Sequence, residues 1–142
     1  MPSSNSPHIE KKFRKEFESL KDIFEVVSEF SASNKLSESQ AFSIKFSIEE
    51  VFTNMVKYNP GGSEVTISLS REGDAVRIGF VDEEKEPFDI TKKEDVDPTL
   101  PIENRKPGGL GIFLIKKIMD HVEYSHDGVH SRITLTKYLE RA

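Results

Sequence analysis

The chain has 142 residues, which is enough for one domain around a single hydrophobic core. Its formal net charge of −5 argues against non-specific binding to a nucleic-acid backbone. It contains no cysteine, which excludes disulfides, thiolate chemistry and cysteine-ligated zinc. The sequence has no apolar run of membrane-spanning length and no signal-peptide pattern, so we expect a cytoplasmic protein without membrane or direct nucleic-acid partners.

The first half of the chain is predicted to form a strand and two helices. An edge strand is expected near residues 8–15, and apolar residues at helical spacing predict a helix over 17–30. Ser37 and Gln40 fit a capping box that opens a second helix. The run Asn-Pro-Gly-Gly at 59–62 is a strong signal for the end of that helix.

The second half of the chain is predicted to be mostly strands. In order, it should hold a strand over 64–70, a turn over 71–74, a strand over 75–81, a buried helix over 110–119 and strands over 122–124 and 131–139. The charged segment 83–107 has little periodicity and is expected to be a lid. After a disordered tail at 1–8, residues 9–142 should form one α+β domain, a two-layer sandwich with helices on one face of a mixed, mostly antiparallel sheet.

The second predicted helix carries Glu50 and Asn54 one turn apart, and they lie about 40° apart around its axis. Glu49 lies about 140° from Asn54 and is therefore not interchangeable with Glu50. The pair is expected to point away from the apolar stripe formed by Ile44, Ile48, Val51, Phe52 and Met55. A carboxylate can accept a proton from an attacking group, and an amide oxygen can ligate a hard cation. A solvated helix face is the alternative interpretation.

A glycine-rich run, Gly108-Gly109-Leu110-Gly111, precedes the last predicted helix. Glycine lets the backbone approach a ligand closely, and the free N–H groups at a helix N-terminus attract phosphate. The run is not a Walker loop, because no Gly-Lys-Ser/Thr follows it. A tight turn packed against the sheet explains it equally well.

Taken together, these motifs resemble the Bergerat fold of the GHKL ATPases. The resemblance lies in Glu50-x-x-x-Asn54 on a helix, Asp82 after a strand, a lid, and the glycine-rich run at 108–111. Three further segments are similar to the anti-sigma factor serine/threonine kinase branch of bacterial partner-switching systems: VDEEKEPFD, GGLGIFLIKKIMD and ITLTKYLE.

The resemblance implies an ATP- and Mg²⁺-dependent serine/threonine protein kinase that is also an anti-sigma factor. Asn54 would ligate Mg²⁺, Glu50 would be the general base, and Asp82 would hydrogen-bond the adenine amino group. The residues at 108–111 would line the phosphate side of the pocket, with Gly108 as the hinge of the lid. Among the cations of the lid, Arg105 is the best placed to reach a phosphate.

The family also implies partners: a STAS-domain anti-anti-sigma protein as substrate, a sigma factor, and a second copy of the chain that pairs through the sheet side. The sequence departs from the family pattern after Asp82, where Glu84 stands in place of a glycine. The alternative interpretation is therefore a non-catalytic adaptor with the same fold and weak or no nucleotide binding.

Overall fold

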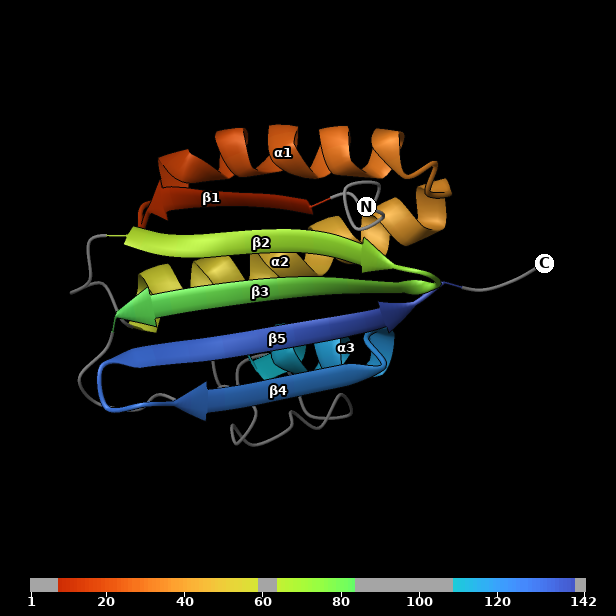
Figure 1. Ribbon diagram of the computed structural model, residues 1–142. Helices are drawn as coiled ribbons and strands as arrows, with labels where there is room; N and C mark the ends of the chain where they lie inside the picture. The colour runs from red at the N-terminus through yellow and green to blue at the C-terminus, as the bar shows by residue number, and fades with distance from the viewer. Residues whose placement is uncertain (1–7, 59–63, 84–108, 140–142) are drawn as a thin grey trace.

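The computed structural model describes residues 8–58, 64–83 and 109–139 (Figure 1). In chain order its elements are β1 (His8–Arg14), the 3-10 helix η2 (Phe17–Ser19), α1 (Leu20–Ser33), α2 (Glu38–Tyr58), β2 (Glu64–Glu72), β3 (Ala75–Glu83), α3 (Gly109–Ile118), β4 (His121–His126) and β5 (His130–Tyr138). The sequence leaves His8 between the tail and the expected edge strand, and in the structure it is the first residue of β1. Residues 1–7, the turn at 59–62 and residues 84–107 of the expected lid lie outside the described residues.

The described strands form one sheet in the order β1-β2-β3-β5-β4, so β1 is an edge strand as expected. All four pairings are antiparallel, and within the described residues the sheet is not mixed. In Figure 1, α2 and α3 lie behind the sheet and α1 lies along the β1 side. The predicted α+β architecture, with helices on one face of a sheet, is confirmed.

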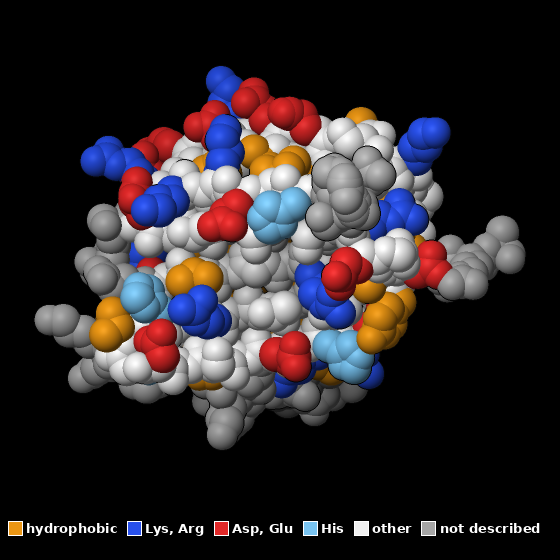
Figure 2. Space-filling model, viewed as in Figure 1, with side chains coloured by type: hydrophobic (Ala, Val, Ile, Leu, Met, Phe, Trp, Pro, Cys, Tyr) orange, Lys and Arg blue, Asp and Glu red, His pale blue; other side chains and the backbone are white. Residues whose placement is uncertain are grey.

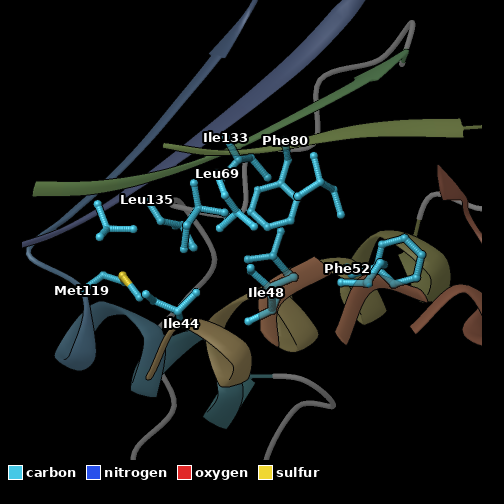
Figure 3. Close-up of a cluster of buried hydrophobic side chains, with 14 of the residues drawn as sticks. Ile44, Ile48, Phe52, Leu69, Phe80, Met119, Ile133 and Leu135 are labelled. Atoms are coloured by element: carbon cyan, nitrogen blue, oxygen red, sulfur yellow. The ribbon is translucent and has the colours of Figure 1, made fainter. Parts of the chain in front are cut away.

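The core lies between the sheet and the helices (Figure 3). Alternate residues of β2 and β3 point into it and are at most 3% exposed: Val65, Ile67, Leu69, Val76, Ile78 and Phe80. The apolar stripe predicted on α2 meets them, and all five of its residues are buried. Burying each side chain of this size contributes roughly 1.5–3 kcal/mol before the loss of conformational entropy.

The helix cap and the hairpin turn predicted from the sequence are both present in the structure. The backbone N–H of Gln40 donates to Ser37 Oγ, and the backbone N–H of Ser37 donates to Gln40 Oε1, which completes the capping box. The turn between β2 and β3 is shorter than predicted, because the ladder continues to the pair Glu72 and Ala75. Gly73 adopts a φ of 58° in this tight turn, a conformation that glycine reaches without strain.

The prediction of a fully buried last helix is wrong for the described side chains of α3. Ile115 is 2% exposed, but Leu114 is 36% exposed. A helix in a two-layer fold faces the sheet on one side and solvent on the other, so apolar residues around its whole circumference cannot all be covered.

The opposite face of the sheet is polar. Figure 2 shows this face in the view of Figure 1, with basic and acidic side chains interspersed over it. Arg77 of β3, for example, forms an ion pair with Glu72 of β2. None of the described helices has the length and apolar character needed to cross a membrane.

Candidate functional site

The elements that carry the candidate residues meet on the helical face of the sheet. The chain directions in Figure 1 bring the end of α2, the end of β3 and the start of α3 toward the same end of the sheet. Helices α2 and α3 also contact each other directly. A site built from Glu50, Asn54, Asp82 and the first turn of α3 therefore requires no rearrangement of the fold.

Asn54 is buried, with only 2% of its surface exposed. At Asn54, the side of α2 that points away from the apolar stripe is therefore covered as well. Because α2 contacts both α1 and α3, more of its circumference is covered than a single stripe would require.

The carboxamide of Asn54 is satisfied on one side only. Its Nδ2 donates to the backbone carbonyl oxygen of Glu50 at 2.6 Å, which orients the group. Its Oδ1 is buried and accepts no hydrogen bond from any described residue. Leaving a buried acceptor unpaired costs about 1–3 kcal/mol, so this oxygen is suited to a ligand that binds an oxygen donor, such as a hard cation.

Glu50 lies one turn before Asn54 and is partly buried. Burial raises the pKa of its carboxyl above the ordinary value, and the neighbouring carboxylate of Glu49 raises it further, while Lys57 acts in the opposite direction. A carboxylate with a raised pKa is a better proton acceptor. The solvated helix face considered from the sequence does not describe this pair.

Asp82 lies within β3 rather than after it, which corrects the sequence-based placement. Its ladder partners are Val65 of β2 and Ser131 of β5. It is 1% exposed, and its Oδ2 accepts a hydrogen bond from Lys15 Nζ at 2.9 Å. The Lys15 side chain is itself 0% exposed, so the two form a buried ion pair.

Lys15 is a residue of this region that the sequence did not single out. A signal was available, because Lys15 stands two positions after the inward-facing Phe13, and side chains two apart along an extended chain share a face. Most of its neighbours between Lys11 and Glu16 are charged, so the sequence did not indicate that Lys15 shares the inward face of Phe13.

The glycine-rich run does not simply precede α3 but partly belongs to it. The helix begins at Gly109, so Gly109, Leu110 and Gly111 form its first turn. The N–H groups of a first turn have no partner within the helix and carry a partial positive charge. Gly108 and Arg105 lie outside the described residues.

A family model described as "Histidine kinase-like ATPase domain" matches residues 13–137. The chain belongs to this family. The match confirms the family resemblance on which the sequence-based expectations rest, and it extends over nearly all of the described structure.

Proteins similar to this histidine kinase-like ATPase domain include serine-protein kinases. RsbW of Halalkalibacterium halodurans is 35% identical over 105 residues, which are 69% of this chain and 62% of that protein. RsbW of Bacillus subtilis strain 168 is 31% identical over 104 residues, 68% of this chain and 63% of that protein. The chain therefore spans slightly less than two thirds of the length of these relatives.

A solved structure supports the fold of the domain. The crystal structure of the RsbU and RsbW domains of Rv1364c from Mycobacterium tuberculosis superposes with a TM-score of 0.68 at 16% identity. The superposition covers 96% of this chain and 33% of that one. At this level of identity the likeness concerns the fold alone.

Membership of an ATPase domain family implies the use of ATP, typically with Mg²⁺. The residues present fit that ligand set in one observable respect. The buried, unpaired Oδ1 of Asn54 is the kind of oxygen that Mg²⁺ accepts as a ligand.

Proposed function

We propose that the chain is an ATP- and Mg²⁺-dependent serine/threonine protein kinase that also acts as an anti-sigma factor. The observation that carries the proposal is the pair on α2: a buried carboxamide oxygen without a described donor, one turn after a carboxylate whose pKa is raised. An ATPase domain family and relatives named as serine-protein kinases supply the class of reaction.

Each residue then has a defined task. Asn54 Oδ1 holds the cation, and bound Mg²⁺ supplies neutralisation of the phosphate charge. Glu50 accepts the proton of a serine or threonine hydroxyl presented by a partner protein. Asp82 accepts a hydrogen bond from the adenine amino group, and the first-turn N–H groups at Gly109 and Gly111 bind phosphate oxygens.

The proposed protein partners follow from the resemblance of the sequence. They are a STAS-domain anti-anti-sigma protein as phosphoryl acceptor and a sigma factor as the sequestered protein. A homodimer that pairs through the open face of the sheet belongs to the same proposal. Arg105 and Gly108 are proposed contributors to phosphate binding and lid movement.

A second candidate function is a non-catalytic adaptor of the same fold. Two observations favour it: Lys15 already donates to Asp82, and Glu84 stands in place of a family glycine two positions after Asp82 in the sequence. Both would weaken base recognition if they obstruct the pocket. Nucleotide binding therefore discriminates between the two candidates.

The test has two stages. Calorimetry with ADP and ATP, each with and without Mg²⁺, measures binding, and radiolabelled ATP with a STAS-domain protein from the same genome measures transfer. The kinase proposal predicts Mg²⁺-dependent binding and label on a serine or threonine of the STAS protein. Absence of binding at millimolar nucleotide would exclude the kinase and leave the adaptor.

A further inference from the structure

The buried ion pair between Lys15 and Asp82 joins two parts of the sheet that are not neighbours. Lys15 directly follows edge strand β1, whereas Asp82 belongs to β3, with β2 between them. The paired residues Phe13, Val65 and Asp82 form one row across the inner face of the sheet. Two strand spacings amount to about 10 Å, and the long four-carbon stem of Lys15 helps to bring its ammonium group to the Asp82 carboxylate.

Stability alone is a poor explanation for this pair. Removing two charges from water costs about as much as their attraction returns, and well-packed apolar residues at such positions are often equally stabilising. What an ion pair adds is a fixed orientation, because the lysine holds one carboxylate oxygen at a set place. A carboxylate has about four acceptor positions, and the hydrogen bond from Lys15 occupies one of those on Asp82.

We propose that Lys15 is a positioning residue for base recognition: it clamps Asp82 through Oδ2 so that the carboxylate is held ready for the 6-amino group of adenine. This inference rests on the proposed function, because it assumes that ATP binds and that Asp82 contacts the base. Lys15 need not touch the nucleotide, and it acts only through Asp82.

The consequence is a base selectivity that depends on a residue far in the sequence from the glycine-rich run and outside α2. A carboxylate that is free to rotate loses more conformational freedom when it accepts a base amino group than one that is already held. Phosphate and Mg²⁺ contacts are made elsewhere and are expected to be independent of Lys15. Loss of Lys15 should therefore weaken recognition of the amino group and leave the rest of the nucleotide affinity in place.

The experiment compares ATP with purine riboside 5′-triphosphate, which is ATP without its 6-amino group, by calorimetry with Mg²⁺. The variants are Lys15→Met, which keeps the apolar stem, and Lys15→Gln, which keeps one N–H donor. Lys12→Met is the matched control, because Lys12 is an exposed lysine of β1. Native protein and control should prefer ATP by about tenfold or more, since a buried acceptor without its donor is costly.

In Lys15→Met the preference should fall to less than about threefold, because ATP binds more weakly while the analogue binds nearly as before. Lys15→Gln should lie between the two. A Lys15 variant that folds and keeps the native ratio overturns the proposal, and a variant that loses affinity for both nucleotides equally does so as well. Failure of the native protein to bind ATP would instead remove the proposed function itself.

A crystal structure of the native protein with ADP tests the same inference where the variants do not fold. Lys15 Nζ should remain within hydrogen-bonding distance of Asp82, with the base amino group on the same carboxylate. A structure in which the nucleotide displaces Lys15 from Asp82, or in which the amino group contacts other residues, overturns it.

Discussion

Two buried polar side chains at the proposed site, Asp82 and Asn54, differ in the partners that the rest of the protein gives them. Asp82 is paired with a cation, because the ammonium group of Lys15 lies 2.9 Å from its Oδ2. The Oδ1 of Asn54 receives no hydrogen bond from any described residue. A buried carboxylate without a cation would cost far more than a neutral amide oxygen without a donor, so the fold supplies a cation to Asp82 but leaves the Oδ1 of Asn54 without a described donor.

The largest effect is expected at Glu50, the proposed general base one turn before Asn54. Glu50→Ala should reduce phosphoryl transfer by about 10²- to 10⁴-fold, the usual contribution of a general base, while ATP binding is retained. Single-turnover transfer with radiolabelled ATP and calorimetry measure the two quantities separately.

Glu49→Ala is the matched control for Glu50→Ala. Because the Glu49 carboxylate raises the pKa of Glu50, its removal should keep transfer and move the acidic limb of the pH–rate profile to lower pH. The rate rises with pH as Glu50 loses its proton. A Glu49→Ala variant as inactive as Glu50→Ala would contradict the assignment of the base.

Removing the cation that pairs with Asp82 should lower the stability of the protein. Lys15→Met leaves the Asp82 carboxylate buried without its cation, and we expect the free energy of unfolding to fall by about 3–5 kcal/mol. Urea denaturation measures this, with Lys12→Met as the exposed control. A loss below about 1 kcal/mol would mean that the pair is open to water in solution.

Replacing Asn54 should affect ligand binding far more than the stability of the protein. Asn54→Ala removes the unpaired oxygen together with one helix hydrogen bond, so the free energy of unfolding should change by about 1 kcal/mol or less. ATP binding should become the same with and without Mg²⁺. The control is Thr53→Ala, since Thr53 also donates to the Glu50 carbonyl oxygen. Mg²⁺-independent binding in the native protein would contradict the role of Asn54.

The smallest expected effect concerns a third carboxylate, that of Asp127 at the surface, and its influence on the pH dependence of stability. Asp127 accepts hydrogen bonds from the backbone N–H groups of His130 and Val129, and these lower its pKa to about 2. Its stabilising contribution is therefore present above pH 3.8 and disappears as the pH falls toward 2. The stability difference between the native protein and Asp127→Asn should shrink over this interval. An NMR titration that places its pKa near 3.8 would contradict the prediction.

Much of the fold could be predicted because its signals are local. The alternation in β2 and β3, the stripe on α2 and the capping box at Ser37 each fix an element within a few residues. Strand pairing is not local, so the sequence predicted a mixed, mostly antiparallel sheet, whereas all four pairings of the described strands are antiparallel. The exposure of Leu114 was also missed, because an all-apolar helix does not indicate which side lacks a covering layer.

The candidate site was predictable as a set of residue types but not as a set of contacts. The spacing of Glu50 and Asn54 on one helix follows from helical geometry, whereas the burial of Asn54 depends on both neighbouring helices. The partner of Asp82 could not be read from spacing, because Lys15 is 67 residues away in the sequence. Long-range ion pairs carry no periodic signal.

That separation has a consequence for how the molecule assembles. Strand β1 pairs with β2 only after the intervening helices α1 and α2 have been accommodated, so closing this loop is entropically costly and should occur late. The contact between Lys15 and Asp82 then forms after the rate-limiting barrier. Loss of the Lys15 ammonium group should accelerate unfolding and leave the refolding rate almost unchanged, so this pair sets the lifetime of the native state rather than the speed of reaching it.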